Sequence, residues 1–143
     1  MAPLHEFKRS LRQPTRGGTV HTQPWPDIVS TYRDFVHRHG WHIEPQLSLV
    51  ERLVASPLSQ HLHACTSMDA LALSDRSDFM WGEHMLRVQY EPTSDEFEFL
   101  YSRYTASTDT MTKRVPSAEG WDTLIRFLRY KYGLHIPETT GNA

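Results

Sequence analysis

The chain contains a single cysteine, Cys65, among its 143 residues. An intramolecular disulfide needs two cysteines, so a disulfide-stabilised fold is excluded. A chain of this length buries enough apolar surface to fold as one domain without a disulfide or a structural metal. Because such a fold does not depend on an oxidising compartment, we expect a cytoplasmic protein.

Long apolar runs are also missing. No segment approaches the roughly eighteen successive apolar residues that a membrane-spanning helix needs. The first residues carry basic side chains but lack the apolar stretch of a secretory signal. We therefore expect no association with a membrane.

The motifs that usually hold nucleotides or zinc are absent from the sequence. The glycine pair Gly17 and Gly18 follows no predicted strand, and neither G-x-G-x-x-G nor G-K-[ST] occurs. The zinc signatures C-x-x-C and H-E-x-x-H are missing as well. These absences argue against the common routes to nucleotide binding and zinc binding.

Charge is present but unevenly distributed, although the net charge is only −2. Residues 1–24 and 110–137 are basic, whereas residues 69–109 are acidic. The first 24 residues also lack sustained periodicity, so we expect a flexible basic tail at 1–24. A single domain is predicted for residues 25–137, followed by a flexible C-terminus at 138–143.

Apolar spacing predicts helices in the first half of the domain. The first begins near Pro26, carries its buried face on Ile28, Tyr32, Phe35 and Val36, and ends at Gly40. The second begins at Pro45 and repeats Leu47, Val50, Leu53 and Val54 at helical spacing. Ser56 and Pro57 resemble an N-cap and a first-turn proline, so a short third helix should lead into the stretch HLHAC at residues 61–65.

After Met68 the period changes to that of strands. Residues 83–91 and 96–104 are separated by PTSD, a four-residue connection typical of hairpins. Pairing Glu91 with Glu96 sets Tyr90 opposite Phe97, and it brings the aromatic and aliphatic side chains of both strands to one face. Residues 68–74 favour a strand but allow a helical turn, and residues 105–116 are either an edge strand or a loop.

The last predicted element is a helix that Ser117 caps and Gly133 ends. Its apolar stripe comprises Trp121, Leu124, Ile125, Leu128 and Tyr132. Helices followed by a meander and a final helix indicate an α+β fold, in which an antiparallel sheet is covered on one face.

The stretch HLHAC places His61, His63 and Cys65 at alternate positions. In an extended backbone the three side chains would point to one side, as zinc ligands must, whereas in a helix His63 would diverge. A fourth ligand could come from the histidines that follow the first helix, which are His37, His39 and His42. The alternative is that these are exposed histidines at helix ends, which complement the helix dipole. Zinc is therefore a possible cofactor, and no other is indicated.

Two catalytic arrangements are conceivable in the same region. Cys65 could be a nucleophile with His61 or His63 as its base, although a lone cysteine is more often a small buried apolar residue. Asp69, Asp75 and Asp78 could act with His84 in acid–base chemistry, although residues 75–78 have ordinary turn composition. An enzyme remains an alternative, and the sequence favours a protein without catalytic activity.

Nucleic-acid binding is a second alternative. The alternation Phe97, Phe99 and Tyr101 is typical of base-stacking strands, and Arg126 and Arg129 lie close to aromatic residues in the last helix. The hairpin register, however, already assigns the aromatics to the core, and the acidic sheet would repel phosphate. The basic N-terminal tail would be the site of any such contact.

The remaining hypothesis is a small protein-binding or regulatory module. Its contact surface would be the acidic side of the hairpin, formed by Glu83, Glu91, Glu96 and Glu98, and its partner would be a protein with a complementary basic surface. The alternative is that these glutamates form an ordinary solvent-exposed face of the sheet and bind no partner. No oligomeric state is predicted.

Overall fold

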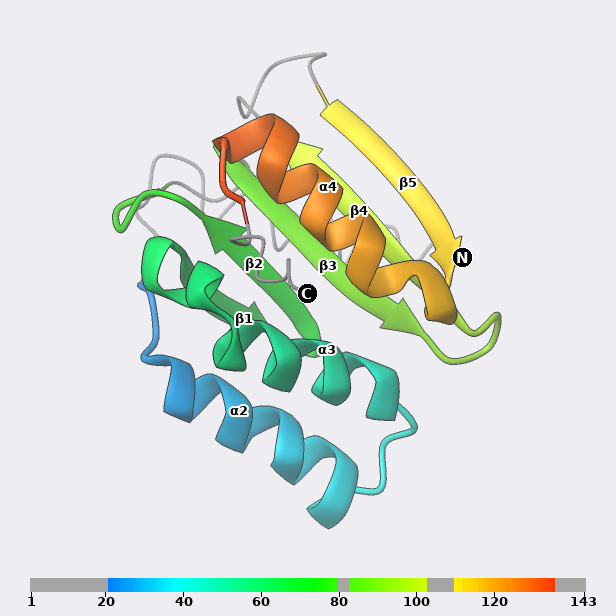
Figure 1. Cartoon of the computed structure of the whole chain (residues 1–143). Coiled ribbons are helices and arrows are strands. Elements are labelled where there is room, and N and C mark those ends of the chain that lie inside the picture. Colours follow the sequence, from blue (N-terminus) through cyan, green and yellow to red (C-terminus); the bar gives the residue numbers. More distant parts are fainter. Residues whose placement is uncertain (1–20, 80–82, 103–109, 136–143) are drawn as a thin grey trace, which may run out of the picture.

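The computed structural model describes residues 21–79, 83–102 and 110–135. Helices precede and follow a five-stranded antiparallel sheet, which confirms the α+β prediction (Figure 1). In chain order the elements are α2 (Trp25–Arg33), η1 (Asp34–Arg38), α3 (Glu44–Ala55), η2 (Pro57–His61), β1 (His63–Ser67), β2 (Ala70–Ser74), β3 (Met85–Glu91), β4 (Glu96–Ser102), β5 (Thr110–Pro116), η3 (Ser117–Glu119) and α4 (Gly120–Tyr132). The predicted tails fall almost entirely outside the described residues.

The first predicted helix consists of two parts. Helix α2 buries Ile28 and Tyr32, as the spacing predicts, and then widens into the π-helical turn η1. The N–H of Trp41 reaches back to the carbonyl of Phe35 at 2.8 Å, and the two rings stack 4.3 Å apart. Gly40 adopts a φ of 69°, which permits this reversal because glycine has no Cβ.

Helix α3 and the short 3₁₀ helix η2 follow as predicted. The hydroxyl of Ser56 accepts the N–H of Leu58 at 3.2 Å, so Ser56 is the N-cap of η2. Helix η2 ends at His61, and Leu62 has an extended backbone. The stretch HLHAC is therefore divided between a helix and a strand.

The sheet is a meander in the order β1-β2-β3-β4-β5, and every neighbouring pair is antiparallel. The predicted hairpin register is confirmed, with Glu91 opposite Glu96 and Tyr90 opposite Phe97. Residues 70–74 and 110–116 are strands, which resolves both open alternatives. The end of the second predicted hairpin strand, residues 103–104, lies outside the described part of the chain.

The α-helices of the described residues, α2, α3 and α4, all lie on one face of the sheet (Figure 1). The main core joins them to the inward-facing residues of the strands, among them Leu71, Val88 and Phe99. We call the opposite side of the sheet the outer face. On β3, β4 and β5 it carries half-buried or exposed side chains, which include Arg87, Gln89, Glu91, Glu96, Glu98, Leu100, Thr112 and Arg114.

The prediction that Ser117 caps the last helix is wrong. Ser117 lies in the 3₁₀ turn η3, and Glu119 occupies the N-cap position of α4 without a side-chain hydrogen bond. The N–H of Ser117 instead donates to the carbonyl of Asp95 at 3.1 Å, which extends the β4–β5 pairing by one step. At the other end Gly133 has a φ of 68° and ends α4, as predicted.

Gly120 at the start of α4 permits a close approach to the sheet. A Cβ atom at this position would lie 2.5 Å from Cδ2 of the Phe97 ring. Real contacts are not this short, so any other residue would force α4 away from β4. The glycine therefore helps to fix how closely the last helix packs on the sheet.

Candidate functional site

The predicted metal ligands of HLHAC do not form a common site. His61 ends η2, whereas His63 and Cys65 lie in β1. His39 caps the C-terminal end of η1, with its ring 6.4 Å from that of Trp41. Within the described residues no three histidine, cysteine, aspartate or glutamate side chains lie close enough to hold a metal ion. The geometry that a zinc site at His61, His63 and Cys65 required is therefore missing.

Cys65 is a small buried apolar residue in this structure. It is 6% exposed and packs with Ala72, Phe79 and Met85 in a second apolar cluster on the outer face. Burial raises the pKa of its thiol to about 11. A nucleophilic cysteine needs a low thiol pKa and access to substrate, and Cys65 has neither.

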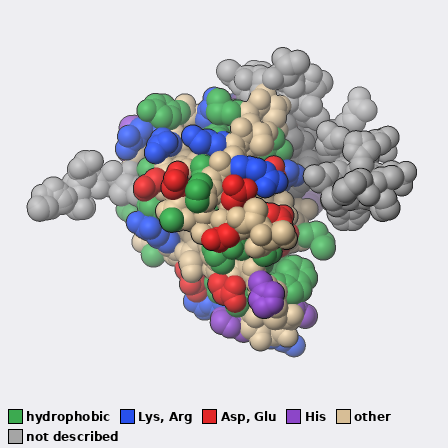
Figure 2. Space-filling model, turned by 90° about the vertical axis from the view of Figure 1, so that its right-hand side faces the viewer, with side chains coloured by type: hydrophobic (Ala, Val, Ile, Leu, Met, Phe, Trp, Pro, Cys, Tyr) green, Lys and Arg blue, Asp and Glu red, His purple; other side chains and the backbone are tan. Residues whose placement is uncertain are grey.

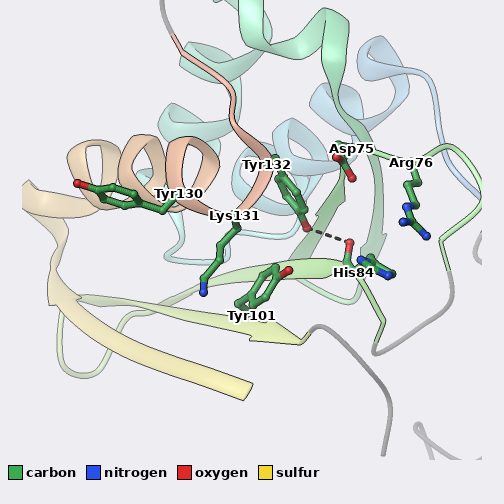
Figure 3. A pocket seen from close by; sticks show the side chains of 7 residues that line it. All are labelled: Asp75, Arg76, His84, Tyr101, Tyr130, Lys131 and Tyr132. Atoms are coloured by element: carbon green, nitrogen blue, oxygen red, sulfur yellow. Dashed lines mark hydrogen bonds between the residues drawn. The ribbon is translucent and has the colours of Figure 1, made fainter. Parts of the chain in front are cut away.

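The proposed acid–base residues separate in the fold. Asp69 accepts a hydrogen bond from Nε2 of Gln89 at 2.9 Å, and Asp78 is exposed. Asp75 and His84 do share a cavity of about 360 Å³ near the end of α4 (Figure 3). The lining comprises Asp75, Arg76, His84, Tyr101, Tyr130, Lys131 and Tyr132.

Tyr132, one of the tyrosines of this cavity, acts as a structural anchor. The hydroxyl of Tyr132 lies 2.9 Å from the carbonyl of His84 and 3.3 Å from that of Leu73, so it holds the segment before β3 against β2. His84 has a φ of 54°, a strained backbone that this hydrogen bond helps to hold. Burial raises the pKa of Tyr132, which remains a neutral donor.

The positive charges of the cavity are spread along it. Nζ of Lys131 lies 5.0 Å from the ring centre of Tyr101, at the opposite end from Arg76 (Figure 3). The helical spacing places Tyr132 in the apolar stripe of α4, and its hydroxyl is the feature of the sequence that indicates an additional polar partner.

The aromatic strand is not available for stacking on bases. Phe97, Phe99 and Tyr101 are 2%, 0% and 6% exposed, and they lie beneath the helices in the main core. The basic tail proposed as a nucleic-acid contact lies outside the described residues, apart from residues 21–24.

Three of the four predicted acidic contact residues lie together. Glu91, Glu96 and Glu98 share the outer face near the β3–β4 turn, and we call them the acidic patch. Arg114 on β5 lies 3.3 Å from Oε1 of Glu96 and 3.6 Å from Oε2 of Glu98. Glu83 lies in the segment before β3 and is not part of the patch. Figure 2, which views the molecule from the right-hand side of Figure 1, shows acidic and basic side chains intermixed on that side.

Comparisons with known protein families, curated proteins and solved structures found no match. Among the described residues, no helix has the length and apolar character required to cross a membrane.

The two edges of the sheet differ. At the β1 edge the N–H of Gln23 donates to the carbonyl of Ala64 at 2.8 Å, and its Oε1 accepts the N–H of Thr66 at 2.9 Å. Gln23 thereby satisfies two outward backbone groups of that strand, the carbonyl of Ala64 and the N–H of Thr66. At the β5 edge residues 110–114 are exposed, and no strand within the described residues pairs beyond them.

Proposed function

We propose that the protein is a protein-binding module whose contact surface is the acidic patch on the outer face. The observation that carries the proposal is the direct opposition of Glu91 and Glu96 in the β3–β4 register. Like charges placed directly opposite in a sheet destabilise it. Glu98 lies beside these two residues. Among the described residues, Arg114 is the cation that forms ion pairs with the patch, through Glu96 and Glu98.

A basic partner surface would relieve this repulsion. Within the described residues no helix covers the face that carries the patch, and its side chains are partly exposed, so a partner could reach it. Complementary charge of this kind mainly speeds and orients association, while apolar contacts supply much of the affinity. Leu100 on the same face offers such a contact.

The alternative is a solvated face, which antiparallel sheets commonly have. The two explanations differ in what neutral substitutions should do. If the acids serve a partner, Glu91→Gln and Glu96→Gln should stabilise the free protein and weaken binding, since functional sites commonly sacrifice stability. If the face is only solvated, the same variants should change stability alone.

Photo-crosslinking tests the proposal. A benzophenone amino acid in place of Leu100 should give a discrete adduct in an extract of the source cells. The same group in place of Arg126, an exposed residue on α4, is the matched control and should not give that adduct. Glu96→Lys with Glu98→Lys should abolish the adduct from position 100. Identical adducts from both positions, or an adduct that survives charge reversal, would contradict the proposal.

A further inference from the structure

The outward-pointing backbone groups of β5 can be identified from its register. The N–H of Ser117 bonds to the carbonyl of Asp95, one step beyond the pair of Glu96 with Pro116. Bonded and non-bonded pairs alternate in an antiparallel ladder, so Val115, Lys113 and Met111 bond to β4. Thr110, Thr112 and Arg114 therefore direct their N–H and C=O groups away from the sheet. Pro116 belongs to the same outward series, where its missing N–H leaves the bonds to β4 intact.

These outward groups form an accessible edge. The side chains from Thr110 to Arg114 are all exposed, and Met111 is 46% exposed although it lies on the helical side of the strand. At the opposite edge of the sheet Gln23 occupies the carbonyl of Ala64 and the N–H of Thr66. Natural proteins usually cover, interrupt or charge an edge of this kind to prevent unwanted pairing, and on β5 Lys113 and Arg114 supply such charges. An edge left accessible on one side only is a suitable site for an added strand.

We propose that β5 accepts an extended acidic segment of a protein partner as a sixth strand of the sheet. The inference rests on the proposed function, because it requires a protein partner, and it adds the position and chemistry of a second contact. Lys113 is exposed on the helical side and forms no ion pair with any described acid. An acidic side chain opposite Lys113 on the added strand would pair with it.

Charge also selects against two other occupants. A second copy of β5 would bring another Lys113 and Arg114 into the same short ladder, where like charges repel. The chain's own first 24 residues carry Lys8, Arg9, Arg12 and Arg16 against Glu6, so they have the same sign as the edge. An acidic segment from another protein meets neither obstacle.

The test uses the full-length protein and a defined peptide. The probe is a labelled eight-residue peptide of alternating valine and glutamate, and its control replaces each glutamate by lysine. The acidic peptide should bind with saturable anisotropy, and the lysine peptide should not. In the ¹⁵N-labelled protein the acidic peptide should slow hydrogen exchange at the amides of Thr110, Thr112 and Arg114, which are the groups that would join the new ladder.

Two variants at the edge distinguish backbone pairing from simple charge attraction. Thr112→Pro removes one outward N–H and should weaken binding by about tenfold or more, whereas Thr112→Val keeps the N–H and should bind like the wild type. Circular dichroism verifies that each variant is folded. Lys113→Glu should reverse the preference, so that the lysine peptide binds and the acidic peptide does not.

Three results would overturn the inference. These are equal binding of both peptides, unchanged hydrogen exchange at Thr110, Thr112 and Arg114 at saturating peptide, and a concentration-dependent dimer that Thr112→Pro makes monomeric. One double variant distinguishes failure of this inference from failure of the proposed function. Glu96→Lys with Glu98→Lys should abolish the crosslinked adduct at the patch and leave the acidic peptide bound at least as tightly.

Discussion

Nε2 of Gln46 in α3 donates a hydrogen bond to the carbonyl of Val88 in β3 at 3.0 Å. Strands β2 and β3 pair only from Leu71 to Leu73 with Leu86 to Val88, so the ladder ends at this carbonyl. Beside it the hydroxyl of Tyr32 donates to the carbonyl of Asp69 at 2.9 Å. Two helices thus supply polar groups where the strands separate, and this joins the helical layer to the sheet at a defined position.

We expect Gln46→Leu to destabilise the protein by about 1–3 kcal/mol, because the buried hydrogen bond from Gln46 to the carbonyl of Val88 would be lost. Urea unfolding of the variant and the wild type measures the difference in free energy. Gln89→Leu is a matched control on the same strand, where a half-buried side chain bonds to Asp69 and less desolvation is involved. The side-chain oxygen of Gln46 is buried and has no hydrogen-bond partner in the described structure. If Gln46→Leu is as stable as the wild type, the burial of this oxygen destabilises the protein as much as the bond to Val88 stabilises it.

Gly120→Ala should destabilise the protein by about 1–3 kcal/mol through overpacking. Alanine normally stabilises a helix relative to glycine, so the sign of the effect is diagnostic. The physical reason is the contact between the added Cβ and the Phe97 ring. In a Phe97→Leu background the same change should cost less, and thermal unfolding of the four proteins gives the coupling. A stabilising Gly120→Ala would contradict the close packing of α4 on β4.

The Cys65 thiol should contribute a loss of stability at high pH. Its pKa of about 11 in the folded protein exceeds the ordinary value of 9.0, so the folded state holds this proton more tightly than the unfolded state. The contribution is complete below pH 9 and is lost as the pH rises toward 11, by about 3 kcal/mol in all. Urea unfolding at pH 8 and pH 10.5 should show a smaller pH dependence for Cys65→Ala than for the wild type. Equal dependence in both proteins would contradict the burial of the thiol.

Tyr132→Phe should lower the free energy of unfolding by about 1 kcal/mol, since it removes the hydroxyl that bonds to the carbonyl of His84. The backbone of His84 is strained, so local hydrogen exchange around residues 83–85 should accelerate more than at distant sites. Tyr130→Phe is the control, because Tyr130 is 75% exposed. Equal effects of the two substitutions would argue against the anchoring role of Tyr132.

Much of this fold could be predicted from the sequence where local patterns determine it. The hairpin register followed from alternation across a short turn, since a slip by one residue would have exposed Phe97 and Phe99. The helical spacing of Ile28 and Tyr32 identified a buried face in the same way. These signals are local, and the structure preserves them.

The features that escaped prediction depend on contacts distant in sequence. The π-helical turn is accompanied by the return of Trp41 onto Phe35, and the burial of Cys65 depends on Phe79 from a following loop. Ser117 has the composition of a cap, but its N–H serves the β4–β5 ladder. The candidate site was partly predictable for a similar reason. Alternation placed Glu96 and Glu98 on the outer face, whereas their shared partner Arg114 became evident only from the pairing of β5.

The most direct test of the account combines stability and binding in one variant. Glu91→Gln with Glu96→Gln removes the opposed charges of the acidic patch without changing the size of the side chains. We predict a higher melting temperature of the free protein, because the repulsion is removed, together with a reduced yield of the crosslinked adduct from position 100. A higher melting temperature with an unchanged adduct yield would contradict the claim that the outer face of the sheet is the binding surface.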